Sequence, residues 1–167
     1  MTARMPPVLR DACPADVPVL AQIWYDGWQD GHAGLVPEKL ARNRTLESFA
    51  DRLMDGLPQV RVVELETGVV GFHMILDDEL NQFFLAAAAR GRGVADRMMA
   101  DVEERLRTAG WGTAWLACAI GNDRAARFYE KQGWNRVGVM TSRLKTPEGV
   151  VSLDVWRYER VIPAGPV

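Results

Sequence analysis

The sequence has little cysteine, little net charge and no long hydrophobic run. Its two cysteines, Cys13 and Cys118, lie far apart and outside any Cys-x-x-Cys pair, which argues against a disulfide framework or a zinc site. A formal net charge of -2 gives no reason to expect nucleic acid as the main partner. No run approaches the roughly 18 apolar residues of a membrane helix, and residues 1–17 contain no apolar signal segment. These absences predict a cytoplasmic protein that needs no membrane, nucleic acid or metal.

Apart from these absences, the composition is that of an ordinary globular protein. The chain has 167 residues, of which 48% are hydrophobic and 25% charged, enough for one domain with a buried core. No internal repeat or linker-like segment divides it. We therefore predict a single domain over residues 1–167, with its core at about 8–161.

Hydrophobic periodicity predicts strands and helices in alternation along the chain. Strands are expected where β-branched and apolar residues alternate or run together, at 8–10, 59–66, 69–76, 80–86, 113–120, 134–144 and 149–161. Helices are expected from Pro14 to about residue 25, over 38–54 with an interruption near 43–45, over 93–109 and over 122–133, the last with Asn122 as its N-cap. The three glycines at 27, 31 and 34 predict a loop over 26–37. This order predicts a mixed α/β sheet with helices on its faces.

The segment from Arg90 to Ala95 joins an apolar strand to an amphipathic helix through two glycines. Such a turn is typical of anion binding, because glycines allow close approach and the first helix amides are unpaired at the positive end of the dipole. It is not a P-loop, which has Lys and Ser/Thr after its last glycine. It is not a dinucleotide fingerprint either, because Asp96 occupies the third glycine place. A flexible helix start with solvated arginines remains the alternative, as does an RNA-binding role for the Arg-Gly repeat.

Two motifs resemble signatures of the GNAT N-acetyltransferase superfamily. Residues 90–95, Arg-Gly-Arg-Gly-Val-Ala, fit the acyl-CoA pyrophosphate signature Gln/Arg-x-x-Gly-x-Gly/Ala. Thirty-two residues beyond Arg90, residues 122–134 resemble the second signature, Asn-x-x-Ala-x-x-x-Tyr-x-x-x-Gly-aromatic. Residues 80–85 resemble the family's fourth strand, and residues 28–40 resemble the loop between its first two helices. The resemblance extends from Val8 to Val161, with His32 where relatives frequently have tyrosine.

The resemblance implies an α/β fold with a mixed, mostly antiparallel seven-stranded sheet, splayed between strands 4 and 5, with helices on both faces. It implies transfer of the acetyl group of acetyl-CoA to a primary amine of a small molecule or peptide. A non-catalytic acyl-CoA-binding or sensing module is the alternative, and a homodimer is left open. The residues that the resemblance places around acetyl-CoA are Phe83, Phe84, Leu85, Arg90, Gly91, Arg92, Gly93, Val94, Ala95, Asn122, Ala125 and Phe128.

Acetyl transfer to an amine requires two proton transfers, one from the ammonium and one to the departing thiolate. By the resemblance, Tyr129 is the general acid, although packing of its ring is the alternative. The candidate base is Glu79 at the start of the fourth strand, with Asp78, His73 or water as alternatives. Trp28 and His32 are the candidates for the acceptor pocket.

Overall fold

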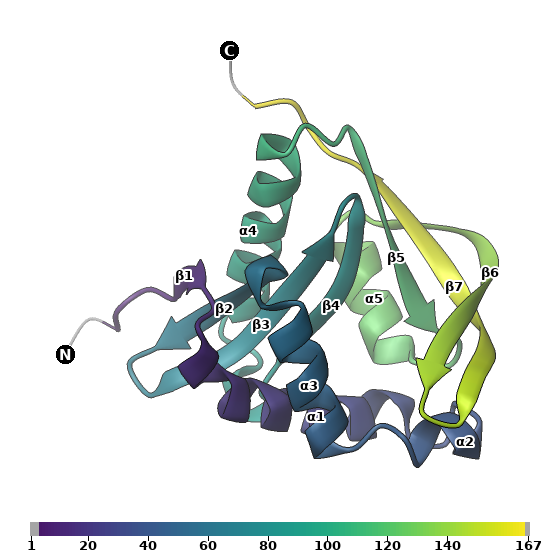
Figure 1. Ribbon diagram of the computed structural model, residues 1–167. Helices are drawn as coiled ribbons and strands as arrows, with labels where there is room; N and C mark the ends of the chain where they lie inside the picture. Colours follow the sequence, from purple (N-terminus) through teal and green to yellow (C-terminus); the bar gives the residue numbers. More distant parts are fainter. Residues whose placement is uncertain (1–3, 166–167) are drawn as a thin grey trace.

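The computed structural model describes residues 4–165, in which one seven-stranded sheet carries helices on both faces (Figure 1). The strands are β1 Val8–Asp11, β2 Val60–Leu65, β3 Gly68–Leu76, β4 Glu79–Leu85, β5 Thr113–Ala119, β6 Asn135–Thr146 and β7 Gly149–Val161. The helices are α1 Val17–His32, α2 Glu38–Ala41, α3 Leu46–Asp55, α4 Val94–Thr108 and α5 Asp123–Lys131. The spatial order is β1-β2-β3-β4-β5-β7-β6, and β4–β5 is the parallel pair in an otherwise antiparallel sheet. The predicted mixed sheet is confirmed.

The sheet opens between β4 and β5. These strands share one register pair, Glu79 with Trp115, and the joint is reinforced by Asp78. The Trp115 amide donates to the Asp78 carbonyl at 3.0 Å, and its indole N–H donates to the Asp78 carboxylate at 3.2 Å. Beyond this joint the strands diverge, and α5 is visible between them in Figure 1. The rest of β4 therefore faces the opening with backbone groups that β5 does not pair.

Apolar clusters on each face hold the helices on the sheet. On one face, α1 and α3 pack on β2 and β3 around the stacked rings of Trp24 and Phe49, whose centroids lie 4.8 Å apart. On the other face, α4 and α5 pack on β4, β5 and β7 around residues such as Met99, Leu116 and Tyr158. Helices thus lie on both faces of the sheet, as predicted, while the edge strand β6 is largely exposed.

The first helix is longer than its glycines predict. We expected a loop from residue 26, but α1 continues to His32. A Cβ atom at Gly27 would lie 2.5 Å from the Phe84 ring, and one at Gly31 would lie 2.9 Å from the Asn122 side chain. The glycines therefore allow α1 to approach β4 and the start of α5, and do not break the helix. The predicted interruption near 43–45 is confirmed, since α3 begins after Thr45, whose hydroxyl accepts from the Ser48 amide.

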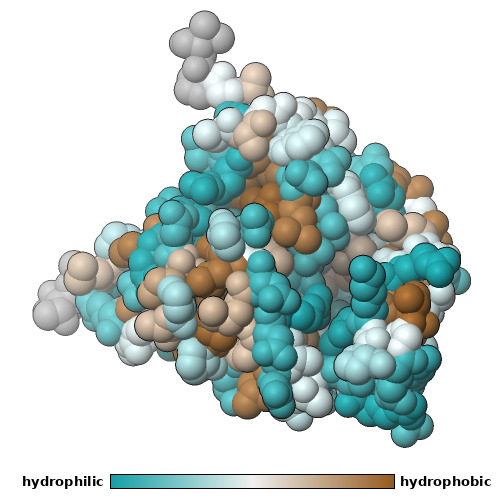
Figure 2. Space-filling model, viewed as in Figure 1, coloured by the Kyte–Doolittle hydropathy of each residue, from teal (hydrophilic) through white to brown (hydrophobic). Residues whose placement is uncertain are grey.

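The surface seen in Figure 2 is a mosaic in which separate hydrophobic areas lie among hydrophilic ones. Within residues 4–165, none of the helices combines the length and the apolar character needed to cross a membrane.

Candidate active site

A cavity of about 500 Å³ lies at the open end of the splay. The end of β4, the turn before α4, the first turns of α5 and the end of α1 form its walls. Its lining includes many residues that the sequence places around acetyl-CoA, namely Phe83, Phe84, Leu85, Arg90, Gly91, Gly93, Ala95, Asn122, Ala125 and Phe128. Arg92 and Val94 instead line a separate hollow beside residues 4–7. The turn therefore presents alternate residues to the large cavity.

The turn before α4 leaves open space in front of its backbone. Gly91 and Gly93 both have φ of 76°, a conformation that favours glycine, and a Cβ built at either would meet no heavy atom within 4 Å. Gly93 is the N-cap of α4, and no side chain caps this end. The first amides of a helix have no acceptor within it. The turn therefore offers free donors at the positive end of a 15-residue helix.

Three cationic side chains line the large cavity. Arg90 lines the cavity and makes one long contact, 3.8 Å, with the Asp30 carboxylate. Arg124 and Lys131 from α5 also line it. Arg124 and Lys131 were not predicted from the sequence, although both lie inside the second motif at residues 122–134. The cavity therefore has the charge to hold a polyanion.

Asn122 lines the large cavity, whereas Tyr129, further along α5, is not among the residues that line it. The Asn122 side chain accepts a hydrogen bond from the Ala125 amide at 3.3 Å, which confirms its predicted capping role. Tyr129 is partly buried, with its ring 6.5 Å from that of Phe83 and 5.6 Å from that of Phe128. Its hydroxyl makes no hydrogen bond within residues 4–165. Burial raises the pKa of Tyr129, so the phenol is protonated at neutral pH.

A second cavity, of about 170 Å³, lies toward the joined end of the splay. Glu79, Asn81 and Gln82 of β4 line it together, although alternate residues of a strand point to opposite faces. A bulge explains this: the register with β3 passes from Met74↔Gln82 to Ile75↔Leu80, which leaves Asn81 as the extra residue. The bulge therefore turns consecutive polar side chains into the cavity.

Glu79 and His32 both line the second cavity. The Asn81 amide group donates to the Glu79 carboxylate at 3.1 Å. Burial raises the pKa of Glu79, which makes this carboxylate a stronger base than a solvated one. His32 stacks on Trp28 with ring centroids 5.4 Å apart, and burial lowers the pKa of His32 to about 4. Both rings lie on α1, not in a loop, and Trp28 is a buried core residue as well as a lining one.

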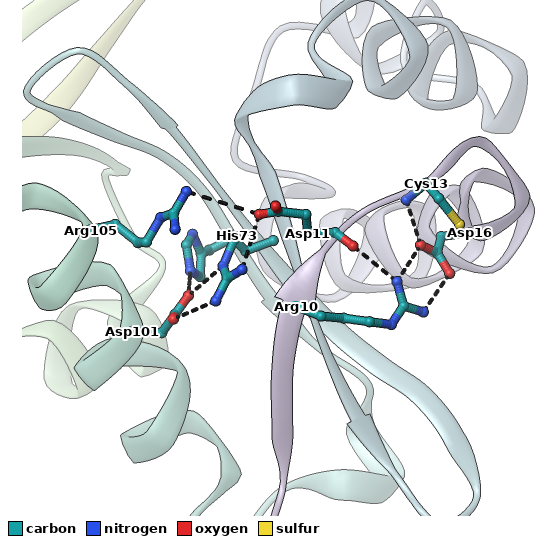
Figure 3. A network of polar contacts seen from close by, with 8 residues as sticks. Arg10, Asp11, Cys13, Asp16, His73, Asp101 and Arg105 are labelled. Carbon is teal, nitrogen blue, oxygen red and sulfur yellow. Dashed lines mark hydrogen bonds and ion pairs between the residues drawn. The ribbon is translucent and has the colours of Figure 1, made fainter. Parts of the chain in front are cut away.

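His73, one of the alternative bases, lines neither cavity. His73 is fully buried on the α4 side of β3, where its Nε2 atom lies 2.7 Å from the Asp101 carboxylate (Figure 3). Arg61 pairs with the same carboxylate at 2.9 Å, so the cluster is a structural contact between sheet and helix. Cys118 is buried in β5, and burial raises the pKa of its thiol to about 12. A thiol with that pKa is a core residue and not a nucleophile.

Comparisons with known proteins identify the family of this chain. The chain belongs to the acetyltransferase (GNAT) family, whose model matches residues 21–134. An uncharacterized N-acetyltransferase of Mycobacterium tuberculosis is 32% identical over 122 residues, which cover 66% of this chain and 76% of that protein. The protein is thus an N-acetyltransferase of this family, as its motifs predicted.

Solved structures share the fold along nearly the whole chain. A GCN5-related N-acetyltransferase from Rhodopseudomonas palustris superposes with a TM-score of 0.72 at 19% identity, over 96% of this chain and 99% of that one. A GNAT phosphinothricin acetyltransferase from Sinorhizobium meliloti, solved in complex with acetyl-CoA, gives a TM-score of 0.67 at 18% identity, over 95% of this chain and 89% of that one.

Proposed function

We propose that this enzyme binds acetyl-CoA in the large cavity and transfers its acetyl group to a primary amine in the second cavity. The observation that carries the proposal is that the two cavities meet at His32, which lines both. One holds an anion-binding turn and the other holds a carboxylate with a raised pKa. The donor and the acceptor would thus approach one another along β4.

The donor substrate fits the residues of the large cavity. The open space at Gly91 and Gly93 allows phosphate oxygens to reach the free amides of the turn. Arg90, Arg124 and Lys131 add positive charge. The edge of β4 that β5 leaves unpaired can bond an extended ligand as an added strand would. The acyl-CoA arm would then run from the turn toward Glu79.

The chemistry needs one base and one acid. Glu79 takes a proton from the acceptor ammonium, directly or through water, so that the nitrogen lone pair can attack the thioester carbonyl carbon. The new C–N bond forms, the C–S bond breaks, and the electron pair leaves on sulfur. Tyr129 donates its phenolic proton to that sulfur, and the newly bonded nitrogen loses its second proton to water, which gives the neutral amide and the free thiol. Bulk solvent restores both protonation states.

Two measurements test this function together. Calorimetry with acetyl-CoA measures donor binding, and release of free thiol in the presence of a panel of primary amines measures transfer. We expect binding and an amine-dependent rate well above the amine-free rate. Acetyl-CoA binding without amine-dependent thiol release would favour the non-catalytic module instead, and absence of binding would refute the proposal.

A further inference from the structure

Two arginines face the second cavity without a carboxylate partner. Arg44 is only 8% exposed, and Arg52 is partly buried. Both line the cavity, and neither side chain makes a hydrogen bond or ion pair with any residue of the described range 4–165. An unpaired buried charge is costly. A guanidinium also has five N–H donors that need acceptors.

The fold holds both arginines in place. Arg44 follows α2, and the two residues before it are fixed to the β6–β7 turn. Arg42 makes a bidentate pair with Glu148 at 2.8 and 2.6 Å, and Asn43 donates to the same carboxylate at 2.5 Å. Arg52, in the last turn of α3, lies with its Cζ atom 4.5 Å from the centre of the Trp24 ring. The cation–π contact fixes this guanidinium but satisfies none of its N–H donors.

The two guanidinium groups are close enough to repel one another. The charge of Arg44 adds to burial in lowering the pKa of Arg52, to about 10. The charged groups that act on Glu79 are different ones, Asp78 and Arg157. The cavity therefore has a cationic side at the arginines and a basic carboxylate at a separate position on β4.

We propose that the acceptor is a small amine that also carries an oxyanion, a carboxylate or a phosphorus oxyanion, which Arg44 and Arg52 bind while the amine faces Glu79. A planar guanidinium matches both kinds of oxyanion through paired N–H donors. The volume of about 170 Å³ favours a compact acceptor over a peptide chain, because ligand pockets usually measure about 300–1,000 Å³. This inference rests on the proposed acetyl transfer.

The test compares matched pairs of acceptors by thiol release. Common L-amino acids are paired with their carboxamides, and aminoalkyl phosphonates with alkylamines of equal chain length. We expect kcat/KM to be at least about 10-fold higher for the anionic member, as a charge-assisted hydrogen bond allows. The series with the larger ratio identifies the oxyanion as carboxylate or phosphonate.

Three variants separate recognition from folding. Arg44→Met and Arg52→Met should each raise KM for the anionic acceptor by roughly 10- to 100-fold and leave neutral amines within about 2-fold. Arg143→Met is the matched control, because Arg143 is exposed on β6 and lies outside the cavity. Thermal melts and acetyl-CoA calorimetry show that each variant is folded and binds the donor.

The outcomes separate this inference from the function on which it rests. If the wild-type enzyme binds acetyl-CoA but prefers neutral amines, or acetylates no anionic amine, the inference is wrong and donor binding stands. Weaker acetyl-CoA binding by Arg44→Met, with unchanged acceptor KM, would assign the arginines to the donor and would also overturn it. Failure of the wild-type enzyme to bind acetyl-CoA refutes the proposed function itself.

Discussion

At the scale of single residues, the Tyr129 hydroxyl is notable because it forms no hydrogen bond within the fold of residues 4–165. The ring is packed against Phe83 and Phe128, yet the hydroxyl has no protein partner within residues 4–165. A buried phenol usually finds a hydrogen-bond partner. An unpaired one beside the diverging strands is suited to donate a proton to a substrate atom.

Replacing Tyr129 with phenylalanine keeps the ring and removes only the proton. We expect kcat to fall by roughly 10- to 1000-fold, within the range of general-acid catalysis, while acetyl-CoA affinity barely changes. Steady-state thiol release and calorimetry measure the two quantities. Tyr25→Phe is the control, because Tyr25 of α1 packs against Phe49 of α3 on the opposite face of the sheet. If Tyr129→Phe keeps full kcat under conditions in which the chemical step limits the rate, then water and not Tyr129 protonates the departing thiolate.

Glu79 gives a prediction about pH. Its pKa is raised by burial, so the basic form appears only above that raised value. Between that value and the pKa of the amine, Glu79→Gln should lower kcat/KM by roughly 100-fold, because general-base catalysis is lost. The difference should shrink at lower pH, where the wild-type carboxyl is protonated too, and at higher pH, where the amine is already neutral.

Asp78→Asn serves as the comparison for Glu79. The Asp78 carboxylate accepts from the Trp115 indole, and an asparagine oxygen can accept there too, so Asp78→Asn should change neither stability nor the pH profile much. If Asp78→Asn abolishes the fall of kcat/KM at low pH and Glu79→Gln retains that fall, then Asp78 is the base.

At the scale of elements, the turn before α4 supplies the donor site. Gly93→Asp places a carboxylate where phosphate oxygens would lie, and it should weaken acetyl-CoA binding by roughly 100-fold through like-charge repulsion. The residue has φ of 76°, so any side chain there costs some stability. Gly93→Asn has nearly the same shape and backbone cost without the charge. We expect calorimetry to show at least about 10-fold tighter binding for Asn than for Asp at this position.

Equal affinities of the two Gly93 variants would show that the charge is irrelevant and that the anion lies elsewhere. Melting curves serve as the control for folding, since both variants should melt at similar temperatures.

Local patterns in the sequence predicted the helices and strands, but they could not predict contacts between segments that lie far apart along the chain. The capping role of Asn122 and the break near Thr45 depend on a few adjacent residues, and both are confirmed. The extension of α1 through Gly27 depends on how closely Phe84 approaches, which no local pattern records. In the same way, the bulge at Asn81 and the position of Arg44 and Arg52 beside β4 depend on tertiary packing.

At the scale of the whole molecule, a charged network ties the first strands to α4. Arg61 of β2 contacts Asp11 of β1 at 3.0 Å and Asp101 of α4 at 2.9 Å. His73 of β3 contacts the same Asp101 carboxylate at 2.7 Å (Figure 3). Burial lowers the pKa of His73 despite the opposing effect of Asp101. Burial alone would raise the pKa of Asp101, but His73 and Arg61 lower it below its ordinary value. The folded protein therefore holds a neutral His73 beside an ionised Asp101.

This arrangement predicts that acid weakens the fold well above the range where carboxylates titrate. The chain has two histidines, His32 and His73, and burial lowers the pKa of both. In the unfolded chain a histidine titrates near 6.5, so below that pH the unfolded state binds more protons and the free energy of unfolding falls. Each histidine should contribute a slope of up to about 1.4 kcal/mol per pH unit as the pH drops from 6.5 toward its folded pKa.

Urea unfolding of the wild type and of His73→Gln, at pH 7.5, 6 and 5, measures that slope. The variant should be less stable at pH 7.5 but should lose less stability on acidification, because one of the two protonation sites is gone. Glu79, whose raised pKa gives the opposite sign, is present in both proteins and cancels in the comparison. Proton NMR titration of the imidazole resonances gives the same answer without a variant. If His73 titrates above 6.5, it forms an ion pair with Asp101 that stabilises the fold in acid, and the predicted sign is wrong.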